Sequence, residues 1–218
     1  MIDVAGNLAA VRARIAAAAA RAGRDAAAVR LVAVSKTQPA ERVRAAVAAG
    51  VRDIGENYVQ EAATKRAAVG GDVRWHLIGH LQRNKAARAL ELFDLIHSVD
   101  SVALAEALAR HAAARGAPAR ALVEVNVGGE ASKSGVAPEA LPALLERLRD
   151  PSLVIEGLMA VPPPGSPDEV RDHFRRLRAL RDAAGLRELS MGMTDDFEVA
   201  IEEGATMVRI GRAIFGAR

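Results

Sequence analysis

The chain has 218 residues, of which 50% are hydrophobic, and a formal net charge of +3. It contains no cysteine, which excludes disulfides and thiolate metal sites, and its 3% of aromatic residues provide few rings on which single-stranded nucleic acid could stack. Because it shows neither a long apolar run nor a secretory leader pattern, we expect a cytoplasmic protein that binds neither membranes nor nucleic acid.

Short apolar segments alternate with helix-like segments along the whole chain. Residues 7–23 predict a first helix that Asn7 caps and Gly23 ends. Eight strands are then predicted at 31–35, 52–55, 74–79, 95–99, 121–127, 153–161, 188–192 and 206–211. Helical patterns lie between them, including those at 40–50, 101–116 and 168–185. The alternation indicates crossover connections and a parallel sheet.

Eight mostly apolar strands favour a closed barrel over an open sheet, and we therefore predict an α/β fold, a single (β/α)8 TIM barrel over residues 1–218. The proline-rich segment 161–167 has the length of an ordinary loop, so it predicts no domain boundary. Only RAIFGAR follows the eighth strand, too little for a full outer helix. We expect the additional N-terminal helix to fill that place.

Polar residues follow most of the predicted strands, where a barrel of this kind carries its active site. The strands lead in turn to Lys36, to Glu56, Asn57 and Tyr58, to His80 and Gln82, to His97 and Ser98, to Asn126 with the glycine-rich segment 128–135, to SMGMTDD and to RIGR. This concentration of polar groups at one rim predicts a functional site there.

Lys36 is one of only four lysines in a chain with 30 basic residues. Arginine keeps its proton in a protein, whereas a lysine can lose it and attack a carbonyl group. Partial burial behind an apolar strand would favour the neutral, nucleophilic amine. We therefore predict that Lys36 forms a Schiff base.

The segments after the seventh and eighth strands, SMGMT and RIGRAIF, combine glycines with helix starts. Barrels of this class frequently bind phosphate with these two loops. A Schiff-base lysine beside a phosphate site fits pyridoxal 5'-phosphate (PLP) and, equally well, a phosphorylated sugar aldehyde. The residues alone leave both ligands open.

Longer motifs narrow this choice. The chain contains LVAVSKTQPAERV, DIGENYVQEA, WHLIGHLQRNKA, HSVDS, VEVNVGGEASKSGV, GLMAVPP and LSMGMTDDFEVAIEEGATMVRIGRAIFG. With these stretches it resembles the PLP homeostasis proteins, the YggS/PROSC family, whose fold is similar to the N-terminal barrel of alanine racemase. The resemblance implies that Lys36 holds PLP as an internal aldimine, that Asn57 lies beside the ring and that Arg209 faces the pyridine nitrogen.

The resemblance also implies a phosphate site, formed by Ser190, Met191, Gly192, Gly211 and the backbone of Arg212. Many family members have threonine or serine at the position of Arg212, with a hydroxyl that can contact the phosphate. Here we expect the guanidinium of Arg212 to substitute for that contact electrostatically, beside the same backbone N–H.

The implied function is vitamin B6 homeostasis. We expect a monomer that buffers PLP or delivers it to PLP-dependent apoenzymes, without established catalysis. A cationic Arg209 disfavours protonation of the pyridine nitrogen and weakens the ring as an electron sink. Racemases of this fold add a catalytic tyrosine from another domain, and this chain has only Tyr58. The alternative is an enzyme, either a PLP-dependent amino-acid racemase or a Schiff-base aldolase using Lys36.

Structural roles are expected for several other polar residues. We interpret His76 as a core histidine, Asp195 and Asp196 as charges at a helix start, and the arginines of 174–181 as a solvated helix face. His80 either lines the mouth of the barrel or caps a helix. No histidine and carboxylate spacing predicts a metal site.

Overall fold

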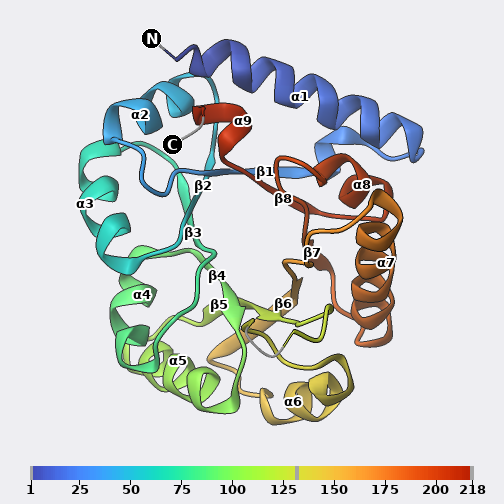
Figure 1. The fold of residues 1–218 in the computed structure, drawn as a ribbon. Helices are drawn as coiled ribbons and strands as arrows, with labels where there is room; N and C mark the ends of the chain where they lie inside the picture. Colours follow the sequence, from blue (N-terminus) through green and yellow to red (C-terminus); the bar gives the residue numbers. More distant parts are fainter. Residues whose placement is uncertain (1, 131–132, 217–218) are drawn as a thin grey trace.

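A computed structural model describes residues 2–130 and 133–216. In this part of the chain, eight parallel strands form a closed barrel in sequence order (Figure 1). The strands are β1 (Arg30–Val34), β2 (Asp53–Glu56), β3 (Arg74–Leu77), β4 (Leu95–Val99), β5 (Ala119–Glu124), β6 (Leu153–Met159), β7 (Glu188–Ser190) and β8 (Met207–Ile210). The predicted TIM barrel is confirmed.

Helices surround the barrel on its outside (Figure 1). They are α1 (Val4–Arg21), α2 (Ala40–Ala48), α3 (Val59–Val69), α4 (Ala86–Leu92), α5 (Val102–Ala114), α6 (Leu141–Arg147), α7 (Pro167–Ala183), α8 (Phe197–Glu202) and α9 (Arg212–Phe215). Single turns of 3-10 helix lie at Ala26–Ala28, Arg83–Lys85 and Pro138–Ala140. No helix within the described residues is long and apolar enough to cross a membrane.

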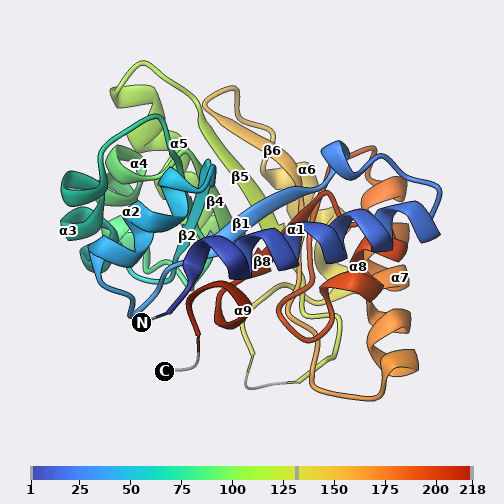
Figure 2. The same cartoon turned by 90° about the horizontal axis from the view of Figure 1, so that it is seen from above.

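Helix α1 takes the place that the short last helix leaves open. It lies along the outside of the barrel next to α8 and α9 (Figures 1 and 2). Leu8, Val11 and Ile15, spaced three and four residues apart, form its buried face. On its outer side Arg14 donates to Glu198 at 2.9 Å. The predicted packing of the N-terminal helix is confirmed.

The start of α1 differs from the prediction. The helix begins at Val4, and Asp3 is its cap, with a side chain that accepts a backbone N–H of the first turn at 2.9 Å. Asn7 instead donates its side-chain amide to the carbonyl of Ile214 at 3.0 Å. The prediction, which relied on the apolar residues from Leu8 onward, chose Asn7 and so placed the cap about one turn too late. Aspartate is as good an N-cap residue as asparagine, and Asp3 takes that position here. Gly23 follows the helix with φ +64°, as expected for a residue that ends one.

The barrel interior is unusually polar. An apolar cluster of Val32, Leu95, Leu122, Met159 and Met207 lies inside the ring of strands. Buried polar side chains share this space, namely Asp53, His76, His97, Ser190 and Arg209. His97 on β4 and Ser190 on β7 contact each other at 2.9 Å, which is possible only across the interior. Barrels of this class usually fill the same layers with branched apolar residues.

The segments outside the barrel agree with the predicted loop and solvated helix. The proline-rich stretch connects β6 to α7, where Ser166 and Glu169 form a capping box. On α7, Leu177 is buried, while Arg171 and Arg175 pair with Glu203 at the edge of α8. The arginines of this helix are therefore engaged in ion pairs at the surface.

Candidate functional site

A cavity of about 540 Å³ opens beyond the carboxyl ends of β1 and β8. Lys36 and Arg209 line it, together with Met193, Asp195, Gly211 and Arg212. Its volume lies within the roughly 300–1,000 Å³ typical of small-molecule sites. The lysine after the first strand and the turns after the seventh and eighth strands therefore share one cavity, at the end of the barrel where the sequence predicted a site.

Four of the eight predicted site residues line this cavity, namely Lys36, Arg209, Gly211 and Arg212. Asn57 is half-buried directly after β2 and packs closely on Gly79, where a Cβ would lie 2.5 Å from the Asn57 carbonyl oxygen. Ser190 and Met191 are fully buried, and Gly192 has φ +92°. These four are not among the described residues that line the cavity, although Ser190 bonds the lining residue Arg209 at 2.6 Å.

Two glycines allow the chain to approach β1 and α8 closely. A Cβ on Gly192 would lie 2.6 Å from the Ala200 Cβ, and its positive φ disfavours any other residue. A Cβ on Gly211 would lie 3.1 Å from the carbonyl oxygen of Val34. Gly211 therefore brings its turn next to the strand that carries Lys36.

The backbone on both sides of Lys36 is held by a buried ion cluster. Lys65 Nζ donates to the carbonyl of Ser35 at 2.5 Å, and Glu61 accepts the N–H of Thr37 at 2.5 Å. Lys65 and Glu61 pair with each other at 2.7 Å. Thr37 has φ +64°, a conformation that costs a β-branched residue free energy. The cluster keeps the turn that presents Lys36 in this conformation.

Glu56 completes the cluster beneath this turn. Its side chain is fully buried, and its Oε1 accepts from Lys65 at 2.6 Å and from the Ser35 hydroxyl at 2.6 Å. Burial raises the pKa of Glu56, although Lys65 and Ser35 oppose the shift. The sequence analysis placed Glu56 at the rim but gave Lys65 no role. The one signal that could have pointed to Lys65 is that lysine is rare in this arginine-rich chain.

Arg209 is a buried cation at the base of the cavity. Its guanidinium donates to the Ser190 hydroxyl at 2.6 Å and to the carbonyl of Ala160 at 2.9 Å. Burial lowers the pKa of Arg209 to about 10, with Asp196 and Glu124 opposing the shift. The side chain is therefore still protonated at neutral pH.

The exposed edge of the cavity carries a second cation. Arg212 Nη2 bonds Asp195 Oδ1 at 2.6 Å, and both side chains are largely exposed. Asp196, the N-cap residue of α8, accepts the N–H of Met193 at 2.5 Å, and burial raises its pKa. The two aspartates thus have separate local partners, which agrees with the structural roles expected for them.

Other predicted rim residues lie outside this cavity. His80 is exposed at the barrel mouth, 3.4 Å from Asp100, and the Ser98 hydroxyl bonds the Gly79 carbonyl at 2.7 Å. Asn126 lines a separate cavity of about 430 Å³, together with residues 128–130, 133 and 135 of the glycine-rich segment. Residues 131 and 132 of that segment lie outside the described residues.

The fold agrees with the comparisons to known proteins. The chain belongs to the family of the alanine racemase N-terminal domain, whose model matches residues 6–218.

Particular relatives match over the full length. A protein of Pseudomonas aeruginosa named pyridoxal phosphate homeostasis protein is 51% identical over 224 residues, covering 100% of this chain and 97% of that protein. A protein of Escherichia coli K12 with the same name is 44% identical over 232 residues, covering 100% of this chain and 98% of that protein.

Solved structures show the same barrel. PipY of Synechococcus elongatus, solved with PLP bound, is 39% identical with a TM-score of 0.87, over 98% of this chain and 100% of PipY. Alanine racemase of Streptomyces coelicolor is 26% identical with a TM-score of 0.69. The match spans 97% of this chain but only 59% of that racemase. The family predicted from the sequence is confirmed.

Proposed function

We propose that this chain binds PLP in the Lys36 cavity and serves PLP homeostasis, as a cytoplasmic monomer that buffers the cofactor or passes it to PLP-dependent apoenzymes. One observation carries the proposal: Lys36, Arg209, Gly211 and Arg212 line a single cavity of about 540 Å³. The full-length similarity to proteins named for PLP homeostasis and to PLP-bound PipY supports it.

The residues present fit this cofactor. Three cationic side chains, Lys36, Arg209 and Arg212, face one carboxylate, Asp195, among the residues that line the cavity. Of these, Arg212 suits a phosphate group, Arg209 is the cation expected beside the ring nitrogen, and the amine of Lys36 suits an aldehyde. PLP, when bound, supplies that aldehyde and an electron-withdrawing ring.

Two features favour a holder of the cofactor over an enzyme. Arg209 is a cation fixed by Ser190 and Ala160, and a cation beside the pyridine nitrogen disfavours protonation there, which weakens carbanion stabilisation. Tyr58, the one tyrosine of the chain, is 62% exposed and does not line the cavity. The chain therefore offers no tyrosine at the site as the second base that racemisation needs.

Hydrogen exchange and cofactor transfer test this function together. We expect the PLP-loaded protein to exchange the α-hydrogen of amino acids in D₂O no faster than free PLP does, and to restore the activity of a PLP-dependent apoenzyme. Rapid exchange that disappears with Lys36→Ala would favour the racemase. A colourless protein that forms a reducible adduct with a sugar phosphate would favour the aldolase.

Charge at the cavity edge should tune PLP affinity in both directions. We expect Arg212→Ala to weaken PLP binding about two- to fivefold and Asp195→Ala to strengthen it by a similar factor, because the two side chains carry opposite charges beside the phosphate. Titration with PLP measures both affinities, and urea unfolding checks that stability changes by less than about 1 kcal/mol, as for an exposed pair. Equal weakening by both substitutions would contradict the electrostatic role.

A further inference from the structure

A continuous row of hydrogen bonds crosses the barrel interior. Arg209 Nη1 lies 2.6 Å from Ser190 Oγ, and Ser190 Oγ lies 2.9 Å from His97 Nδ1. His97 Nε2 lies 2.9 Å from His76 Nδ1, and His76 Nε2 lies 2.8 Å from Asp53 Oδ1. None of the five residues is more than 4% exposed. We call these residues the relay.

Only one arrangement of protons gives every donor of the relay an acceptor within it. Asp53 as a carboxylate only accepts, so His76 donates from Nε2 and accepts at Nδ1. His97 must then donate from Nε2 and accept at Nδ1 from the Ser190 hydroxyl. Ser190 in turn accepts from Arg209, which can only donate. All four bonds therefore point from the cation to the anion, and both histidines are neutral with the proton on Nε2.

The surroundings of the histidines agree with this arrangement. Burial, together with the positive charges of Arg209 and Arg30, lowers the pKa of His97 well below its usual value, so His97 is neutral at physiological pH. Burial opposes the ionisation of Asp53, but hydrogen bonds from His76 and Arg74 outweigh it and lower the pKa of that carboxyl.

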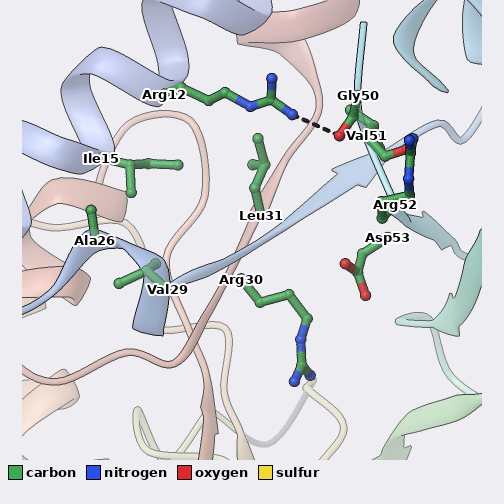
Figure 3. A pocket seen from close by; sticks show the side chains of 10 residues that line it. All are labelled: Arg12, Ile15, Ala26, Val29, Arg30, Leu31, Gly50, Val51, Arg52 and Asp53. Carbon is green, nitrogen blue, oxygen red and sulfur yellow. Dashed lines mark hydrogen bonds between the residues drawn. The ribbon is translucent and has the colours of Figure 1, made fainter. Parts of the chain in front are cut away.

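The relay joins the two ends of the barrel. Arg209 lines the Lys36 cavity, whereas Asp53, the first residue of β2, lines a cavity of about 310 Å³ at the amino ends of the strands. Figure 3 shows Asp53 with Arg30 and Arg52 at the edge of this second cavity. Arg74 also reaches Asp53, at 2.7 Å. The relay therefore ends at the Asp53 carboxylate, which pairs with Arg74 at the amino ends of the strands.

We propose that His76 and His97 are positioning residues, which hold the Arg209 guanidinium and the Ser190 hydroxyl in one orientation beneath the cofactor cavity. In this arrangement the Ser190 hydroxyl bonds Arg209 and His97 and does not bind phosphate. The identity of the cofactor rests on the proposed function, but the relay belongs to the protein without its ligand.

Nitrogen NMR of the histidine rings in the cofactor-free protein tests the relay directly. We expect His76 and His97 to be neutral Nε2–H tautomers at neutral pH, and Ser190→Ala to shift the His97 Nδ1 resonance because that nitrogen loses its donor. A protonated ring, an Nδ1–H tautomer at either residue, or no shift in Ser190→Ala would overturn the proposal. This result does not depend on whether PLP binds.

Cofactor affinity then tests the positioning role. We expect His97→Leu to weaken PLP binding about tenfold, because Ser190 loses a buried hydrogen-bond partner and no longer fixes Arg209. His97→Gln, which keeps a donor and an acceptor, should recover much of that loss. His173→Leu on the outer helix α7 is the matched control and should bind as the unsubstituted protein does.

Two results would contradict the positioning role. Equal affinities of His97→Leu and the unsubstituted protein would overturn it. Equal weakening by Leu and Gln would also overturn it, because only the hydrogen bonds distinguish these two side chains in the proposal. Unfolding by urea identifies a variant that fails to fold, in which case Ser190→Ala replaces it: the same loss of affinity is then expected, and unchanged affinity overturns the role.

Discussion

Lys65→Met is expected to destabilise the fold by about 3–5 kcal/mol, because it leaves the charge of Glu56 buried without its cationic partner. Glu56 is fully buried and Lys65 nearly so, and the same lysine also bonds the carbonyl of Ser35. Urea unfolding measures the effect. Arg149→Met is the matched control, because its partner Glu146 is largely exposed and surface pairs contribute at most about 1 kcal/mol.

The loss of folding stability in Lys65→Met should increase as the pH rises. Burial already raises the pKa of Glu56, and Lys65 opposes that shift, so removing Lys65 raises the pKa further. A carboxyl with a raised pKa in the folded state stabilises the fold below its ordinary pKa and loses that contribution as the pH rises through the raised value. The deficit of Lys65→Met should therefore be small in acid and grow toward neutral pH.

A second substitution separates charge from packing in this cluster. Adding Glu56→Gln to Lys65→Met removes the buried charge and should restore part of the stability at neutral pH. A deficit that is the same at all pH values, or no larger than that of Arg149→Met, would show that the ion cluster does not support the turn at Lys36.

Lys36→Ala is expected to abolish the aldimine colour that PLP gives to the loaded protein and to leave only that of the free aldehyde, because no other lysine is among the described residues that line the cavity. Arg209, Arg212 and the backbone near Gly211 still line the cavity, so weaker, noncovalent binding of PLP should persist. Absorbance and equilibrium dialysis separate the two effects.

Lys85→Ala is the control for this loss of colour. Lys85 ends the 3-10 turn that follows β3 and does not line the Lys36 cavity. It should bind PLP and take up its colour as the unsubstituted protein does. Unchanged colour in Lys36→Ala would mean that another amine reacts with the cofactor.

Much of the fold was predictable because the signals are local. Each strand is a short apolar run between helical repeats, and the order of these runs alone defines parallel crossover connections. The position of Lys36 at the rim, two residues after the end of β1, then follows, since parallel strands present their carboxyl ends at one face. Gly211 and Arg212 were predictable in the same way, from their place after β8.

The supporting contacts were not predictable, because they join residues that are distant in sequence. His97 and Ser190 are 93 residues apart and meet only when β4 and β7 face each other across the closed barrel. The Lys65 side chain reaches Glu56 and Ser35 only once α3 packs on the barrel. The contacts of the Ser190 hydroxyl with His97 and Arg209 inside the barrel were likewise not predictable.

The most direct test of the proposed function is the site of covalent attachment. PLP-loaded protein is reduced with borohydride and digested, and mass spectrometry locates the added pyridoxyl group. One modified residue is expected, Lys36, with no label on Lys65, Lys85 or Lys133. Label on another lysine, or no stable label after reduction, would contradict the assignment of the cavity between β1 and β8 as the PLP site.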